Sequence, residues 1–287
     1  MIYLLLSILA STIIIVLFKL FERYKVNTLQ AIVFNYYSAF LCGIFLYNAP
    51  INVRDIASSI WFYGAIALGF LFILIFNLMA LTAQRNGLSV ASVAAKMSVV
   101  IPIAFGILVY HESVGFQKIT GILLALVAVY LTAVKPNSKF NLKNGLLLPF
   151  SVFLGSGIID TSVKYIETTY LASNGIPIFS ATIFGCAAII GTLILFFKSI
   201  NSPFKFDLKN LIGGILLGIV NYGSIYFLLK ALQYEGLESS SIFTVNNVAI
   251  VMLSTIIGLA LFKEQIFKKN WIGILIAIIS IALVTLA

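Results

Sequence analysis

Lys96 is the charged residue whose place in the sequence most needs an explanation. It lies about eight residues into the apolar run from Leu88 to Tyr110, or about 12 Å along a helix. A charged group at membrane depth costs roughly 2.5–3.5 kcal/mol and therefore usually has a function. Two interpretations remain open: Lys96 presents its charge to a carboxylate or phosphate group, or it pairs with an acid on another helix. Pro102, on the same run, lacks a backbone N–H and is expected to kink the helix toward a cavity.

A second pair of charges lies near the end of a later apolar run. Asp160 and Lys164 are four residues apart and share one helix face, so a local ion pair is the favoured interpretation. The alternative is that Asp160 pairs with Lys96 across a cavity, which would form a protonatable switch.

Buried amides and a tyrosine form a third group of candidate residues. A buried amide requires a hydrogen-bond partner, which either a substrate or a neighbouring helix can supply. Asn246 and Asn247, on the ninth apolar run, can serve either purpose. The other residues deep enough in their runs to line a cavity are Asn35, Tyr36, Asn77 and Asn221.

Two glutamates end apolar runs, Glu112 after the fourth run and Glu264 after the ninth. Both are expected near the membrane surface. Their position favours a conformational or capping role over substrate binding.

The remaining reactive residues form no catalytic or metal-binding pattern. Cys42 and Cys186 lie isolated inside apolar runs, and His111 is the single histidine. The sequence has no phosphate-binding Gly-x-x-x-x-Gly-Lys-Ser/Thr loop and no Ser/His/Asp or His/Glu set. We therefore expect no cofactor, no metal and no enzyme activity. An intramembrane enzyme acting on a lipid-linked group ranks as a lesser alternative.

The composition indicates the elements that must position these residues. Of 287 residues, 61% are hydrophobic and 9% are charged, and the mean hydropathy is +1.11. A soluble domain has about 25% charged residues, so this chain could not cover itself with a polar surface in water. The net charge of +9 comes mostly from short loops, which indicates membrane orientation rather than nucleic-acid binding.

Ten apolar segments are long enough to cross a bilayer core about 30 Å thick, which requires roughly 20 residues. They predict an all-α integral membrane protein, since β-barrel strands alternate over about ten residues. Ile2–Phe18 is interpreted as the first spanning helix because no basic region precedes it, as one would in a signal peptide. The segments are Ile2–Leu20, Leu29–Tyr47, Ser59–Ala83, Leu88–Tyr110, Phe116–Ala133, Leu146–Lys164, Ile176–Phe197, Leu211–Ala231, Ser239–Phe262 and Trp271–Ala287.

Lysine and arginine are distributed unequally between the two sets of loops. Thirteen follow odd-numbered segments and four follow even-numbered segments. The positive-inside rule then places the first set in the cytoplasm and both termini outside.

The two halves of the chain match one another in order, which predicts an internal repeat. At successive offsets of about 145, 149 and 152 residues, Lys19 falls on Lys164, Gly87 on Gly236, and Glu112 on Glu264. The expected division is a five-helix repeat over 1–134, a polar linker over 135–145 and a second five-helix repeat over 146–287. An odd number of helices per half inverts the second copy, an architecture associated with alternating access in transporters.

In each half a helix ends in a glutamate followed by a helix that contains an early glycine: Tyr110-His111-Glu112 before Gly121, and Phe262-Lys263-Glu264 before Gly273. With these motifs the chain resembles the EamA family of the drug/metabolite transporter superfamily. The resemblance covers nearly the whole chain. It implies a ten-helix basket around a central cavity lined by helices one to four and six to nine, with helices five and ten peripheral.

Two features depart from the family pattern. The ninth segment carries Asn246-Asn247 and has no proline to match Pro102. Family members usually keep both termini in the cytoplasm, whereas the charge distribution places them outside.

The leading functional expectation is a secondary transporter of a small metabolite, with an amino acid or related carboxylate as the first choice of solute. An ion gradient, such as a proton gradient, or the solute gradient itself would drive it. Cationic drug efflux ranks lower because that chemistry uses a glutamate in helix one, and Ile2–Phe18 contains no acid. The expected location is the bacterial cytoplasmic (inner) membrane, as a monomer or a homodimer, with no nucleic acid as partner.

Overall fold

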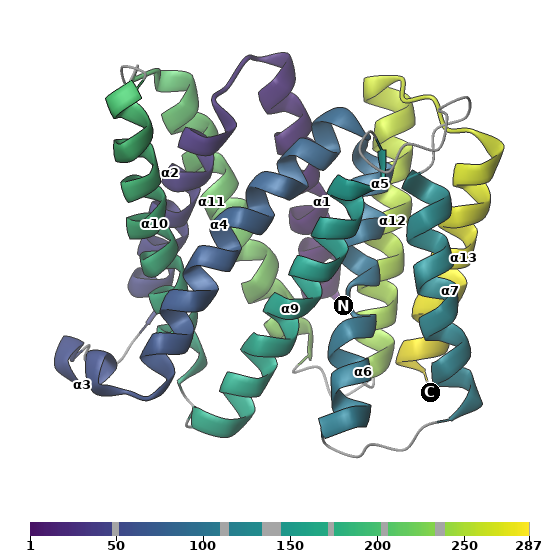
Figure 1. Cartoon of the computed structure of the whole chain (residues 1–287), viewed down its shortest axis with the longest axis horizontal. Coiled ribbons are helices and arrows are strands. Elements are labelled where there is room, and N and C mark those ends of the chain that lie inside the picture. The colour runs from purple at the N-terminus through teal and green to yellow at the C-terminus, as the bar shows by residue number, and fades with distance from the viewer. Residues whose placement is uncertain are drawn as a thin grey trace. The chain divides into compact units, whose positions relative to one another are not determined.

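The structure is a computed structural model that describes residues 1–47, 52–109, 115–133, 145–171, 175–201, 206–232 and 239–286 (Figure 1). Every regular element in these residues is an α-helix. The helices are α1 (Ile2–Arg23), α2 (Thr28–Leu46), α3 (Val53–Ser58), α4 (Trp61–Arg85), α5 (Leu88–Met97), α6 (Val100–Val109), α7 (Phe116–Ala133), α9 (Leu147–Tyr170), α10 (Ile176–Asn201), α11 (Leu208–Leu232), α12 (Ser239–Phe262) and α13 (Lys268–Thr285).

Each of the ten expected segments coincides with helix, which confirms the all-α class. In the described residues, seven helical segments are long and apolar enough to cross a membrane: α1, α2, α4, α5 with α6, α10, α11 and α12. The other three expected segments coincide with α7, α9 and α13, which are not among the seven found in the described residues. A full set of ten crossings therefore stays a prediction.

The fourth segment is not one continuous helix, because it breaks at Ser98–Val99 into α5 and α6. Pro102 explains the break, since it has no N–H to donate to the carbonyl of Ser98 and its ring crowds that carbonyl. The Ser98 carbonyl instead accepts a tighter bond from the N–H of Ile101 at 2.9 Å. The expected kink is thus a two-residue turn at Ser98–Val99 that separates α5 from α6.

The short helix α3 lies in a connection where the sequence pattern predicted no helix. It begins at Asn52, whose side chain accepts a hydrogen bond from the N–H of Arg54 at 3.1 Å. A helix of six residues is too short to show apolar periodicity, so only its cap could have indicated it.

Two compact units make up the chain, and unit 1 comprises Met1–Leu20, Leu78–Ile158 and Gly223–Ala287. In it, α7 and α13 run side by side, with Ala125 and Ala277 fully buried (Figure 1). Ser280 Oγ donates to the carbonyl of Gly121 at 2.7 Å. The small residues at Gly121, Ala125, Gly273 and Ala277 therefore pack two helices of one chain against each other.

Unit 2 comprises Phe21–Asn77 and Ile159–Tyr222. Its α2 packs against α10 (Figure 1) and against α11, where Gly214 and Gly218 allow a close approach. A Cβ at Gly214 would lie 2.6 Å from the carbonyl oxygen of Ala31. Close packing of this kind, rather than the hydrophobic effect, holds helices together in lipid.

The two units do not follow the predicted division into halves. Each unit takes segments from both halves, and α1, α4, α9 and α11 contribute residues to both units. A sequence repeat does not require each copy to be compact by itself. The division into 1–134 and 146–287 therefore stays a prediction, and most of the linker at 135–145 lies outside the described residues.

Candidate functional site

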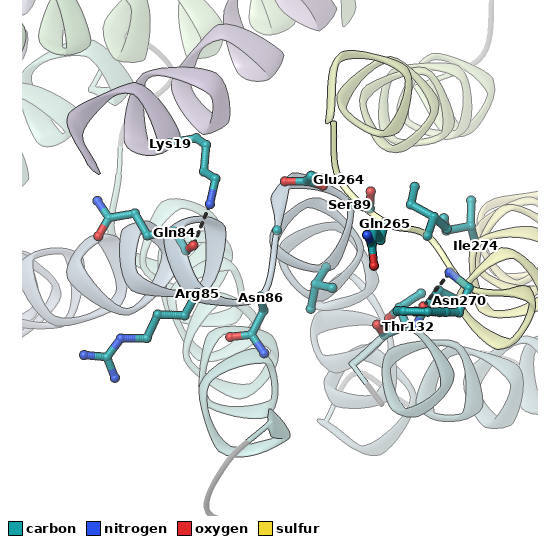
Figure 2. A pocket seen from close by; sticks show the side chains of 14 residues that line it. Lys19, Gln84, Arg85, Asn86, Ser89, Thr132, Glu264, Gln265, Asn270 and Ile274 are labelled. Atoms are coloured by element: carbon teal, nitrogen blue, oxygen red, sulfur yellow. Dashed lines mark hydrogen bonds between the residues drawn. The ribbon is translucent and has the colours of Figure 1, made fainter. Parts of the chain in front are cut away.

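A pocket of about 410 Å³ lies within unit 1, where the turn from α4 to α5 meets the connection from α12 to α13 (Figure 2). Its polar side chains come from these two connections and from the ends of the neighbouring helices. Its lining consists of Lys19, Gln84, Arg85, Asn86, Gly87, Ser89, Val90, Thr132, Glu264, Gln265, Ile266, Phe267, Asn270 and Ile274.

The turn between α4 and α5 has a backbone that only glycine adopts easily. At the end of α4, the carbonyl of Thr82 accepts from the N–H groups of Asn86 and Gly87, at 2.8 and 3.2 Å. Gly87 then has φ +109°, a region that is strained for residues with a side chain. Its carbonyl accepts from Ala91 at 3.2 Å and so starts α5.

Glu264 caps the N-terminus of α5 from a distant part of the chain. Its Oε1 accepts a hydrogen bond from the backbone N–H of Leu88 at 2.8 Å. The carboxylate fits between two glycines, since a Cβ would lie 2.9 Å from Oε2 at Gly87 and 2.6 Å from it at Gly258. The first N–H groups of a helix have no partner within the helix, so a carboxylate is well placed there.

The surroundings of Glu264 act on its proton affinity in both directions, and burial is the largest effect. Burial raises the pKa of its carboxyl group above the ordinary value, although the N–H groups of Leu88 and Ser89 and the charge of Lys19 act in the opposite direction. Lys19 is held by a hydrogen bond to the carbonyl of Gln84 at 2.6 Å, as Figure 2 shows. The Gln84 side chain in turn donates to the carbonyl of Phe18 at 2.9 Å.

Ser89, the second residue of α5, has a hydroxyl group without a partner. The residue is only 5% exposed, and its Oγ is a buried polar atom with no hydrogen bond from any described residue. Figure 2 shows its side chain close to Glu264 and Gln265. Buried hydroxyl groups are nearly always hydrogen-bonded, so this atom needs an explanation.

The opposite wall of the pocket is fixed by Asn270 at the start of α13. Its Nδ2 donates to the carbonyls of Leu131 and Thr132, at 3.1 and 2.9 Å, and its Oδ1 accepts from the N–H of Phe267 at 3.1 Å. These bonds tie the α12–α13 connection to the end of α7. The pocket therefore has two walls held by hydrogen bonds between distant segments.

Of the predicted site residues that the structure describes, only Glu264 lines this pocket. In unit 1, Lys96 is half-buried in the last turn of α5, and Pro102 is half-buried in α6. Asn246 and Asn247 are buried in α12, and Ser7 Oγ donates to Asn246 Oδ1 at 3.1 Å. Glu112 lies outside the described residues.

The candidates in unit 2 take part in helix contacts. Asn221 Nδ2 donates to Asn35 Oδ1 at 3.2 Å, which joins α11 to α2. Tyr36 is fully buried among aromatic rings and donates to the carbonyl of Phe72 at 2.8 Å. Asn77 donates to its own helix at Ile73, and Asp160 is exposed on α9. The ion pair of Asp160 with Lys164 stays a prediction.

Sequence reasoning did not group Lys19, Gln84, Ser89 and Asn270 into one site. Gln84 and Ser89 are close in the chain, but Lys19 and Asn270 are far from them, so no local spacing connects all four. One signal was present: the Gln84, Gly87 and Leu88 turn and the Glu264 motif both recur in the repeat alignment.

The seven long apolar helices and the absence of any strand in the described residues place the chain in the class of all-helical membrane proteins. No known protein-family model matches the chain. It is similar to an uncharacterized protein of Haemophilus influenzae, with 32% identity over 285 residues that cover 96% of this chain and 94% of the relative. At that identity over nearly the full length of both, the chain belongs to the same family as the Haemophilus influenzae protein.

Proposed function

We propose that this chain is a secondary transporter of a small metabolite, with an amino acid or related carboxylate as the first solute class to test. The observation that carries the proposal is the interruption of a membrane-spanning helix beside a charged residue. The apolar span Leu88–Gly106 breaks at Ser98–Val99, two residues after Lys96.

Interrupted helices are a recurrent feature of solute sites in transporters. The free backbone groups and the helix ends at such a break bind substrates and ions near the middle of the membrane. Lys96 stands at the end of α5, and α6 begins at Val100. A lysine that costs free energy in the membrane, placed at a break, suits recognition of a carboxylate or phosphate group.

The resemblance to EamA transporters and the internal repeat support the same proposal. If the halves are inverted copies, corresponding helices should play corresponding roles. In agreement with this, corresponding helices divide between the two units in the same way. Unit 1 contains the first parts of α1 and α9, as far as residues 20 and 158, and the last parts of α4 and α11, from residues 78 and 223. Two alternative arrangements of inverted copies would provide alternating access.

Flux measurements in proteoliposomes test the proposal. We expect saturable transport of one or more labelled amino acids, carboxylates or phosphorylated metabolites, with and without a pH gradient. In Lys96→Met the flux of an anionic solute should fall at least tenfold. Lys230→Met is the matched control, since Lys230 also lies in the last turn of a helix and is exposed.

The possible outcomes test separately whether the chain transports these solutes and whether Lys96 contacts them. Flux lost in Lys96→Met and retained in Lys230→Met supports both transport and the role of the interrupted helix. Flux that survives in Lys96→Met keeps the transporter and rejects Lys96 as a solute contact. Absence of flux from folded protein for the whole panel counts against a carrier of these solutes.

A further inference from the structure

We propose that the pocket of unit 1 binds a small anion, a carboxylate or a phosphate group, through Lys19 and Ser89, and that Glu264 must take up a proton for the anion to bind. The inference does not rest on the proposed transport function, because it concerns binding at equilibrium and not flux. The pocket is formed entirely by residues of one compact unit.

The first argument is the hydroxyl group of Ser89. Buried hydroxyl groups in proteins normally form a hydrogen bond, and no described residue forms one with Ser89 Oγ. Ser89 lines a pocket of about 410 Å³, which is large enough for a ligand with several heavy atoms. A ligand oxygen in the pocket would supply the missing partner.

The second argument is the charge of the lining. The ionisable residues that line the pocket are Lys19, Arg85 and Glu264. Lys19 lies beside the pocket with its ammonium group bound to the carbonyl of Gln84, and an ammonium group carries three donors. Arg85 adds positive charge, although its guanidinium group points away from Glu264 in Figure 2. The N-terminus of α5 contributes further positive potential.

The third argument is that the structure already shows a carboxylate in this environment, namely the side chain of Glu264. A second anion beside it would meet like charge in a partly buried site, which is unfavourable. A proton on Glu264 removes that repulsion and converts its carboxyl group from an acceptor into a donor. Anion and proton should therefore bind together.

The charged and polar groups around Glu264 come from several helices. Lys19 belongs to α1 and Arg85 to α4, while α5 presents the N–H groups of Leu88 and Ser89. The adjoining residues of its own connection that line the pocket, Gln265 and Ile266, carry no charge. Among the described residues no second acid lines the pocket, so a single titration should govern anion binding.

The test is calorimetric titration of the purified full chain with sulfate and with acetate at several pH values. Sulfate has the tetrahedral shape of phosphate and does not titrate near neutral pH. Sulfate affinity should fall about tenfold for each pH unit above the pKa of Glu264, since one proton is linked to binding. Buffers with different ionisation enthalpies should show uptake of up to one proton per anion.

Three variants assign the effect to the named residues. Ser89→Ala should weaken sulfate binding about tenfold without loss of stability, because its hydroxyl group has no partner among the described residues. Lys19→Met should weaken binding by at least as much. Glu264→Gln should bind sulfate independently of pH and without proton uptake.

Ser92→Ala is the matched control, since Ser92 is buried on the same helix but bonds to Ser89 O and Ser254 and does not line the pocket. It should leave sulfate affinity unchanged. The proposal is overturned if no anion binds saturably at any pH. It is equally overturned if Ser89→Ala binds like Ser92→Ala, or if wild-type binding involves no proton.

Nanodiscs of two lipid compositions distinguish a lipid headgroup from a soluble anion as the natural ligand. In nanodiscs that contain phosphatidylglycerol, a lipid headgroup in the pocket would compete with sulfate, and the competition would disappear in Ser89→Ala. Sulfate affinity equal to that in phosphatidylcholine nanodiscs would identify a soluble carboxylate or phosphate as the ligand.

Discussion

Single residues at the α4–α5 turn determine whether the pocket forms. Gly87 combines a positive φ of +109° with a carboxylate directly beside its Cα. Neither requirement can be satisfied by another amino acid without strain, because a side chain disfavours this backbone region and would meet Glu264.

Gly87→Ala is therefore expected to destabilise the chain by about 1–3 kcal/mol. A Cβ would lie 2.9 Å from Glu264 Oε2, so the cap of α5 would shift. Thermal unfolding in detergent measures the effect. Gly115→Ala is the control, because a Cβ there meets nothing within 4 Å. Equal unfolding temperatures for the two variants would contradict the assignment.

The pH dependence of stability should show the raised pKa of Glu264. The folded chain holds this proton to a higher pH than the unfolded chain. The stability that this bound proton contributes to the folded chain is complete below the pKa of Glu264 in the unfolded chain. It is lost as pH rises through the pKa of Glu264 in the folded chain. The unfolding temperature of wild type should therefore fall relative to that of Glu264→Gln as pH rises from about 4.5, the ordinary value for glutamate. A difference that does not change with pH would show that Glu264 does not titrate in this way.

At the residue scale, the sequence predicted roles more readily than contacts. The position of Glu264 at the end of a helix predicted a conformational or capping role, and its Oε1 accepts a hydrogen bond from the N–H of Leu88. The identity of that partner could not be predicted, because 176 residues separate the two. Asn35 and Asn221 were predicted as polar residues at depth, but only packing shows that they bind one another.

Among the helices, the interruption between α5 and α6 differs most from a regular membrane span. Pro102 predicted a kink in the helix, because a proline has no N–H to donate to the carbonyl four residues earlier and its ring crowds that carbonyl. The pairing of α7 with α13 was not decided by sequence, because small residues allow close approach within one chain or between two chains. The short helix α3 escaped prediction since it depends on one local cap at Asn52.

Pro102→Ala should restore the hydrogen bond to the Ser98 carbonyl and join α5 to α6. Hydrogen exchange of peptides around Ser98 should slow, and thermal stability should hold or rise. If the break forms part of a solute site, flux should fall at the same time. Pro177→Ala is the control, because Pro177 lies in the first turn of α10, where its N–H would have no helical partner. Unchanged exchange at Ser98 would show that Pro102 does not cause the interruption.

The distribution of charge predicts the orientation of the whole chain in the membrane, and thiol labelling in intact cells measures that orientation. The bias of thirteen against four basic residues predicts cytoplasmic loops after the odd-numbered helices. In a background without Cys42 and Cys186, a membrane-impermeant reagent should label Ile60→Cys and Phe116→Cys, which are 74% and 86% exposed. Tyr24→Cys and Ser138→Cys should react only after permeabilisation.

The same four positions test the crossings that the apolar helices leave open. Phe116 and Ser138 flank α7, which is not among the seven long apolar helices, so opposite labelling of the two would show that α7 crosses the membrane. Equal labelling would remove that crossing and, with it, the five-helix repeat and the inversion of the second half. A complete reversal of all four results would keep the crossings and place the termini in the cytoplasm, as in the EamA family. In that case the pocket with Lys19 and Glu264 would face the outside, and its anion and proton would have to come from there.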